Sequence, residues 1–308
     1  MLQKKFSALY QGLLTIILIM VLFLFSFLIL TRQTITSSDY LIDTADKVKY
    51  YDETTTQINQ AIQDLGMASG INKDGLKNAI SSEQVAKDFT LFIQHSFSGD
   101  GYKTDEKPIK DSVRKAIENY AEKENKVIDQ NNKQSIEFFL DKSYEIYDSN
   151  IRLPLVPTIG LKAERFRHQI FKLLGILGII FIVMLVLLYF ASHKHKHVLL
   201  RFFAYANLST GILYIFLAII LKFFNPINRI GLSQKNLFDL VTSFINGMLP
   251  MTVGIMLIFI VVGLILAFLS IRIRSNLIDK SERREREREE SFDMFYKQNR
   301  MAKEKNER

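Results

Sequence analysis

The chain has 308 residues, of which 48% are hydrophobic and 23% are charged, and its formal net charge is +8. The distribution of this charge argues against a nucleic-acid-binding surface, because residues 32–168 carry 19 Lys and Arg against 22 Asp and Glu. The basic surplus lies at the ends of apolar runs and in the C-terminal segment, where it is a topology signal. The absence of cysteine excludes disulfides and thiolate metal sites.

Four long apolar runs follow one another along the chain, at residues 6–31, 173–191, 202–221 and 240–271. A helix rises about 1.5 Å per residue, so roughly 20 apolar residues cross the hydrocarbon core of a bilayer. The first run follows Lys4 and Lys5, as in a signal peptide, but it is too long for one and ends without a small-residue cleavage site. We therefore expect an uncleaved signal anchor and three further spans.

The sequence predicts an all-α membrane protein with four transmembrane helices and a helical extracytoplasmic domain between spans 1 and 2. The expected segments are a cytoplasmic N-terminus (1–8), span 1 (9–31), the extracytoplasmic helical domain (32–168), span 2 (169–191), a cytoplasmic loop (192–201), span 3 (202–222), an extracytoplasmic loop with an interfacial helix (223–246), span 4 (247–271) and a charged cytoplasmic helical tail (272–308).

The orientation follows from the tendency of Lys and Arg to collect at the cytoplasmic ends of spans. Basic residues at the ends expected inside are Lys4, Lys5, Lys194, Lys196, Arg201, Arg272 and Arg274. The opposite end of span 2 is also basic, with Lys162, Arg165, Arg167 and Lys172. The short basic N-terminus before a long first span favours a multi-pass protein of the cell membrane with both termini in the cytoplasm. An extracytoplasmic domain without cysteine is typical of a bacterium.

Helical periodicity dominates the domain between the first two spans. Apolar and Thr residues recur every three or four positions between residues 39 and 65, which predicts one continuous helix with a heptad-like, coiled-coil-type seam packed inside a bundle; they are Leu41, Thr44, Val48, Tyr51, Thr55, Ile58, Ile62 and Leu65. Gly66 and Gly70 are expected to end this helix.

Two further helical regions are expected in the same domain. The first begins at Ser81 or Ser82, where Ser81 and Gln84 have capping-box spacing, and continues to about residue 97, before the Ser-Gly-Asp-Gly stretch at 98–101. The second runs from Pro108 to about residue 150, and the polar stretch 129–133 is a candidate break. Pro154 and Pro157 are expected to end the domain and lead to span 2.

No catalytic motif stands out, and the spans contain no Asp, Glu, Lys or Arg in their cores, which argues against an enzyme and a stand-alone secondary transporter. His193 and His197 share the spacing of a helical metal pair, but the intervening lysines favour a basic turn, and no cofactor is expected. The pairs Gly175 with Gly178 and Gly254 with Gly263 are candidates for close helix approach within the membrane.

The C-terminal segment offers a candidate docking site. Opposite charges alternate at helical spacing over residues 281–290, and an apolar patch follows at Phe292, Phe295 and Tyr296. Together with Arg201 of the inner loop, these residues are the candidates for contact with a cytoplasmic partner. The alternative is a frayed helix lying against the membrane surface.

Two functions remain open, and in both of them the protein acts by binding a partner or ligand and not by catalysis. The order of one span, an outer domain and three spans is similar to that of the four-span permease subunits of the MacB and FtsX type; this resemblance of layout implies a non-catalytic subunit of a cell-envelope assembly, working with a cytoplasmic ATPase. The alternative is a membrane sensor or regulator whose outer bundle binds a ligand or protein and signals through a cytoplasmic partner. The expected partners are the lipid bilayer, another membrane or cytoplasmic protein and, in some assemblies, a second copy of the chain.

Overall fold

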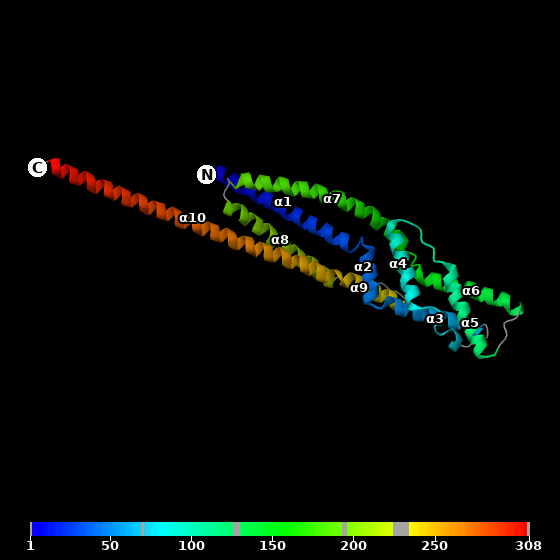
Figure 1. The fold of residues 1–308 in the computed structure, drawn as a ribbon. Coiled ribbons are helices and arrows are strands. Elements are labelled where there is room, and N and C mark those ends of the chain that lie inside the picture. Colours follow the sequence, from blue (N-terminus) through cyan, green and yellow to red (C-terminus); the bar gives the residue numbers. More distant parts are fainter. Residues whose placement is uncertain are drawn as a thin grey trace. The chain divides into compact units, whose positions relative to one another are not determined.

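The computed structural model describes residues 2–68, 71, 73–125, 130–192, 196–223 and 234–306, and every regular element in these ranges is helical (Figure 1). The elements are α1 (Leu2–Gln33), α2 (Ser38–Lys47), α3 (Tyr50–Ala68), the 3-10 helix η1 (Lys73–Leu76), α4 (Ser82–Ser98), α5 (Glu106–Lys123), α6 (Gln130–Ile151), α7 (Val156–Ala191), α8 (Lys196–Phe223), α9 (Lys235–Asn246) and α10 (Met248–Asn306).

The chain divides into two compact units, and the boundaries between them fall within α1, α7, α8 and α10. The membrane unit comprises Met1–Ser26, Ile176–Phe216 and Val253–Arg308. The bundle unit comprises Phe27–Gly175 and Leu217–Thr252. The bundle unit is thus built from two stretches of chain that are separated by residues 176–216, which hold most of the second and third apolar runs.

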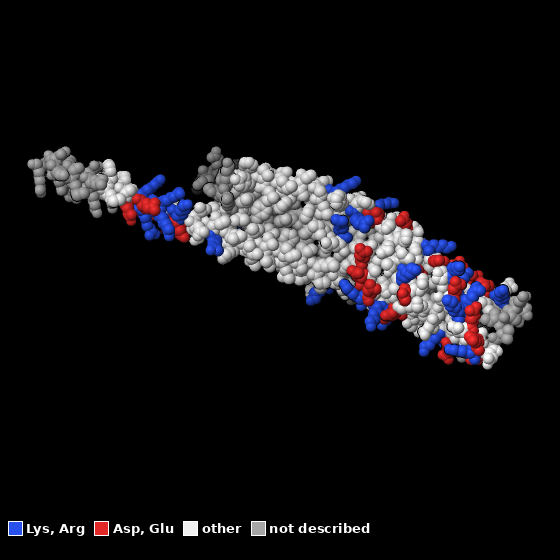
Figure 2. Space-filling view, in the orientation of Figure 1, with Lys and Arg blue, Asp and Glu red and all other residues white. Residues whose placement is uncertain are grey.

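Four helical segments are long and apolar enough to cross a membrane: Tyr10–Gln33, Lys133–Ala191, His197–Phe223 and Lys235–Phe292. The prediction of four long apolar helices is therefore confirmed, and it indicates a multi-pass membrane protein. Figure 2 shows the apolar stretch as a white region without Lys, Arg, Asp or Glu, whereas blue and red side chains mingle over the bundle and along the later part of α10.

Side chains from three helices form the apolar centre of the membrane unit. Leu14 and Leu18 of α1 pack with Met184 and Leu188 of α7 and with Ala206 of α8. Two hydrogen bonds between neutral groups join these helices: the Gln11 side chain donates to the Ala191 carbonyl oxygen at 2.6 Å, and the Tyr214 hydroxyl donates to Ser26 at 2.8 Å. Neutral hydrogen-bonding groups of this kind suit a medium that supplies no water to replace a lost partner.

Two glycines bring α8 and α10 together within the membrane unit. A Cβ on Gly263 would lie 2.7 Å from Leu208 Cγ, and one on Gly211 would lie 2.8 Å from Ile260 Cγ1. Of the glycines expected to permit close approach, only Gly263 has this role; a Cβ on Gly175, Gly178 or Gly254 would meet nothing within 4 Å. The expectation failed for these three because helical spacing cannot tell a face that meets a neighbouring helix from one that does not.

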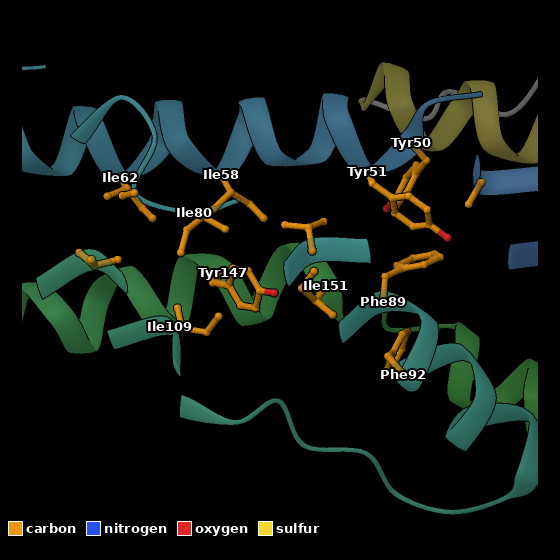
Figure 3. Packing of buried hydrophobic residues seen from close by; sticks show 14 of the residues in the cluster. Tyr50, Tyr51, Ile58, Ile62, Ile80, Phe89, Phe92, Ile109, Tyr147 and Ile151 are labelled. Atoms are coloured by element: carbon orange, nitrogen blue, oxygen red, sulfur yellow. The ribbon is translucent and has the colours of Figure 1, made fainter. Parts of the chain in front are cut away.

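One apolar core holds the bundle unit together (Figure 3). Tyr50 and Tyr51 of α3 lie against Phe89 of α4, with ring centroids 4.9 and 5.7 Å apart respectively. Further along α3, Ile58 is fully buried opposite Tyr147 of α6. Burial raises the pKa of Tyr50 and of Tyr51 to about 12, so both phenols stay neutral at physiological pH.

The structure confirms the expected start and end of α4. Ser81 is the N-cap, and its hydroxyl accepts a hydrogen bond from the Gln84 backbone N–H at 3.2 Å. Gly99 ends the helix with φ +83°, a left-handed conformation that glycine adopts without strain. The helical region expected from Pro108 to about residue 150 consists of two helices. Helix α5 begins two residues before Pro108, and α6 begins within the polar stretch 129–133, the candidate break. Residues 126–129 lie outside the described residues.

The expectation of a single helix over residues 39–65 is wrong, because α2 and α3 are separated at Val48 and Lys49. Lys49 has φ +55°, which costs a non-glycine residue free energy. Helix α2 contacts α4 and α9, whereas α3 contacts α4, α6, η1 and α9. Because of the break, the two halves of the seam pack against different sets of helices. All eight seam residues are buried or half-buried. Gly66 lies inside α3 rather than at its end, and Gly70 is outside the described residues.

Helix α9 belongs to the bundle core, a role that its position between the last two apolar runs did not reveal. Leu240 is 2% exposed and is part of the bundle's apolar cluster. Asn236 is also buried and donates to Thr54 Oγ1 at 2.9 Å. At the other end of α9, the Tyr40 hydroxyl donates to the Phe244 carbonyl oxygen at 2.9 Å. The segment expected to be an interfacial helix is therefore a structural part of the bundle.

Two helices continue well beyond the apolar runs that they contain. Helix α7 begins at Val156, and Ala163 in its first turns is 6% exposed in the bundle core. Pro157 therefore lies in the first turn of α7, where proline is tolerated, and does not end the bundle. Helix α10 runs without a break from Met248 to Asn306, so the predicted charged tail is the continuation of the last apolar helix.

We predict that Leu240→Ala lowers the free energy of unfolding of the bundle by about 2–5 kcal/mol, because it leaves a cavity in a closed core. Thermal and denaturant unfolding of the purified full-length protein, followed by the tyrosine signal in near-UV circular dichroism, measures the change. Asn246→Ala on the exposed end of α9 is the matched control, and equal stability of the two variants would contradict the assignment of α9 to the core.

Candidate functional site

A groove of about 540 Å³ lies where the C-terminal ends of α4 and α6 meet the beginning of α7. Its principal lining residues are Phe92, Tyr102, Tyr144, Asp148, Arg152 and Pro157. Phe92 is almost fully buried at the base, whereas Arg152 and Pro157 are exposed at the edge. The groove thus has an aromatic interior and a polar, accessible edge.

Backbone geometry explains why three helix ends converge there. The left-handed turn at Gly99 ends α4 and starts the loop that carries Tyr102. Gly160 in the first part of α7 lies directly against the Ser96 carbonyl oxygen, because a Cβ at that position would be only 2.3 Å from it. Only glycine permits this approach, which seats α7 on the end of α4.

A buried carboxyl group, Asp88, organises the side chains behind the groove. Asp88 is 4% exposed and accepts hydrogen bonds from the Tyr147 hydroxyl at 2.7 Å and from the Gln84 side-chain amide at 2.8 Å. The Tyr102 hydroxyl donates to its other oxygen at 3.2 Å. Buried polar groups need such partners, and this network fixes the position of Tyr102, which forms part of the groove wall.

The tyrosines that bind Asp88 are held in their neutral form. Burial, followed by the hydrogen bond to Asp88, raises the pKa of Tyr147 far above its ordinary value of 10. Burial and the charge of Asp88 raise the pKa of Tyr102 in the same direction. Both phenols therefore remain hydrogen-bond donors throughout the physiological pH range. The network is suited to holding the shape of the groove wall.

The edge of the groove is acidic. Asp100, Glu145 and Asp148 line it together with a single basic side chain, Arg152, which forms an ion pair with Asp148. The second carboxylate oxygen of Asp148 is buried without a hydrogen-bond partner in the part of the chain that the structure describes. Carboxylates beside the aromatic rings of Tyr102 and Tyr144 make a chemical environment that favours an amine, a guanidinium group or a basic peptide.

The residues predicted to dock a partner lie in the membrane unit, and the structure does not bring them together. Phe292 and Phe295 are 64% and 60% exposed on α10, and Tyr296 follows on the same helix. Arg201 is exposed on α8, one turn after His197, whose carbonyl oxygen accepts a hydrogen bond from Ser270 of α10. Phe292 is 22 residues beyond Ser270, or about 33 Å along the helix. Docking at either place stays a prediction.

The histidine pair cannot be judged, since His193 and His195 lie outside the described residues. Within the described ranges, no group of three or more His, Cys, Asp and Glu side chains is arranged to hold a metal ion. Ser192, before this segment, is buried and its hydroxyl donates to the Leu188 carbonyl oxygen at 2.7 Å. Helix α8 begins at Lys196, so much of the segment expected as a loop over 192–201 is helical.

Sequence reasoning missed the residues that build the groove, although one signal was present. Asp88 lies three residues after Val85 and four before Phe92, so it interrupts the apolar face expected for α4. A carboxyl group on a buried face requires hydrogen-bond donors. In the structure these donors include the hydroxyl groups of Tyr102 and Tyr147. The sequence has no comparable signal for Arg152 or Asp148. These residues line the groove because α6 ends, and α7 begins, beside α4.

Comparisons of the chain with protein-family models, with curated proteins and with solved structures gave no match.

We predict that Tyr147→Phe destabilises the bundle by about 1–3 kcal/mol, because it removes a hydrogen bond from a buried carboxyl group. Tyr144→Phe is the matched control: the Tyr144 hydroxyl donates to the Thr104 carbonyl oxygen at 3.0 Å at a partly exposed site, where water can replace it. Denaturant unfolding of the full-length variants measures both changes. A Tyr147→Phe variant as stable as the control would contradict a central role for the Asp88 network.

Proposed function

We propose that the protein is a non-catalytic membrane sensor or regulator: the bundle binds a ligand in the groove, and the spans carry the signal to a partner of the charged tail. The observation that supports this most directly is the continuity of α10, which starts at Met248 beside the bundle helix α9 and runs to Asn306. At about 1.5 Å per residue, such a helix is close to 90 Å long. A single stiff helix can transmit a rotation or shift between its ends.

The packing of α9 against the bundle connects the bundle to α10. Asn236 and Leu240 are buried against α2 and α3, and only Gly247 separates α9 from α10. Gly247 itself lies against the Tyr40 hydroxyl, which a Cβ would approach to 2.4 Å. A shift of α2 or α3 would therefore displace the first turn of α10.

Helix α7 gives the groove a second connection to the spans. Pro157 lines the groove, and the same helix continues without interruption to Ala191. A ligand that draws Asp148 away from its ion pair with Arg152 acts on the short link between α6 and α7. The acidic edge and aromatic interior make a cationic ligand, such as an amine or a basic peptide, the class that fits.

The proposed orientation puts the bundle outside the cell membrane and both termini in the cytoplasm. Its support is the basic pair Lys4 and Lys5 before the first apolar run and the basic residues after the last one. Because the chain has no cysteine, one introduced thiol reports its own side of the membrane.

We predict that Glu118→Cys, exposed on α5, reacts with an impermeant maleimide in intact cells. Ser281→Cys, exposed on α10, should react only after the membrane has been opened. Labelling is measured by the mass of the purified protein. Protection of the first thiol combined with labelling of the second would reverse the proposed orientation.

A second prediction tests signal transfer through α10. Seven alanines inserted after Arg274 keep the helix continuous and in nearly the same rotational phase, whereas seven Gly and Ser residues break it. We expect the alanine variant to restore the transcript and envelope-protein profiles of cells lacking the protein. The Gly/Ser variant should resemble a chain without residues 281–308, and equal restoration by both insertions would refute transfer through the helix.

The permease-type alternative, with its cytoplasmic ATPase, depends on residues 192–201 instead of the tail. Exposed Arg201 at the start of α8 is the feature that favours it. Arg201→Glu in the same complementation experiment separates the two functions. The sensor proposal expects this variant to behave as the wild type, while an ATPase-coupled subunit should lose activity with it and tolerate loss of the tail.

A further inference from the structure

A second cavity, of about 590 Å³, lies at the boundary between the first apolar run and the bundle. It is formed by the end of α1, the turn that follows, the first residues of α2 and one turn of α7. Its lining is dominated by Ile29, Arg32, Ser37, Arg167, His168 and Phe171. All of these residues belong to the bundle unit, and none takes part in the groove described above.

The polar part of the cavity presents hydrogen-bond donors. Arg32 pairs with no carboxylate among the residues that the structure describes. Arg167 has only a long, half-exposed ion pair with Glu164, at 3.5 Å, and Glu164 also contacts His168 at 3.2 Å. The amino-terminal end of α2, with the Ser37 hydroxyl, opens into the same space. Two guanidinium groups around one cavity favour an anion such as a phosphate.

Acidic groups near the cavity do not cancel this preference. Asp39 is one of its lining residues, and it accepts a hydrogen bond from the Ser38 hydroxyl at 3.4 Å. The charges of Asp39 and Glu164 balance those of Arg32 and Arg167, but α7 also carries Lys162, Arg165 and Lys172 outside the cavity lining. The region therefore keeps a positive balance even with His168 neutral. Figure 2 shows blue side chains near the end of the white, uncharged region.

The apolar part of the cavity faces the spans. Ile29 belongs to the apolar run of α1, and Phe171 is 69% exposed at the start of the apolar run of α7. A ligand that fills this site therefore meets cationic donors at one side and exposed hydrocarbon at the other. Only an amphiphile satisfies both, since a soluble anion would leave Ile29 and Phe171 uncovered.

The charge pattern gives an independent reason for a ligand here. Basic residues at Lys4 and Lys5 and at Lys162, Arg165, Arg167 and Lys172 flank opposite ends of the apolar helices. Topology requires an excess of positive charge at only one side of a membrane. The second basic cluster therefore opposes the orientation signal and needs another function, which anionic headgroups supply.

We propose that this cavity binds the phosphate-bearing headgroup of one anionic phospholipid through Arg32 and Arg167, with the acyl chains against Ile29 and Phe171. The site is independent of the proposed sensor function and of the orientation of the protein, because anionic lipid can meet it from either leaflet. A bound lipid would contact both the end of α1 and the turn of α7 that carries Arg167 and Phe171.

The test is native mass spectrometry of the full-length protein in detergent, titrated with phosphatidylglycerol or with zwitterionic phosphatidylcholine. We expect one phosphatidylglycerol to bind the wild type in preference to phosphatidylcholine. The double variant Arg32→Gln, Arg167→Gln should bind it roughly tenfold more weakly or worse, because each basic group near a headgroup contributes about 1 kcal/mol. The double variant Lys107→Gln, Lys115→Gln removes the same two charges from exposed positions on α5, outside the cavity, and should bind nearly as well as the wild type.

Three outcomes would overturn the proposal: equal lipid affinity of the arginine double variant and the α5 double variant, no preference over phosphatidylcholine, or displacement of the lipid by millimolar inorganic phosphate. The last result would assign the site to a soluble phosphate compound. Circular dichroism checks that the variants are folded. Should the double variant fail to fold, Arg32→Gln alone tests the same point, because this exposed side chain has no carboxylate partner to lose.

Discussion

The burial of α9 in the bundle is the interaction from which most of the architecture follows. Leu240 closes the apolar core, and the Asn236 amide donates both to Thr54 and, at 3.2 Å, to Gln57. These contacts pull the short connection between the last two apolar helices into a domain that otherwise lies between the first two. The bundle is consequently attached to α1, α7, α8 and α10 and not to one pair of spans.

This attachment connects the bundle to the first turn of α10 through Gly247. Helices in lipid satisfy their own backbone hydrogen bonds, so they can continue into water without a change of structure when their sequence favours a helix. Both α7 and α10 use this freedom, the first at its amino-terminal end in the bundle and the second over its charged carboxyl-terminal part. A helix that is packed at one end and exposed at the other is suited to carry a displacement.

Polar groups are placed where they set shape or meet ligands. Asp88 is enclosed by hydroxyl and amide donors and fixes the wall of the groove. Asp100 and Glu145 are exposed at the groove edge, and Arg32 and Arg167 are exposed at the boundary cavity. The two sites thus differ in the sign of their charge, with mainly acidic side chains at the groove and two guanidinium groups at the boundary cavity.

Local patterns in the sequence predicted a good part of this structure. The four apolar helices, the start of α4 at the Ser81 cap and its end at Gly99 depend on residues close together in the chain, where hydrophobicity, capping and backbone conformation act directly. Periodicity also identified the buried seam, but it could not place the break at Lys49, because that break depends on which helices lie opposite.

Only the tertiary structure decided the long-range contacts. It selected Gly211 and Gly263 as the close-approach glycines, buried α9 in the bundle, and assembled both cavities from segments more than a hundred residues apart or from several helix ends. The sequence by itself determined which segments are helices and which prefer lipid, since these are local free energies. Which helix faces meet was settled by the packing of the complete chain, because the burial of one side chain depends on all those around it.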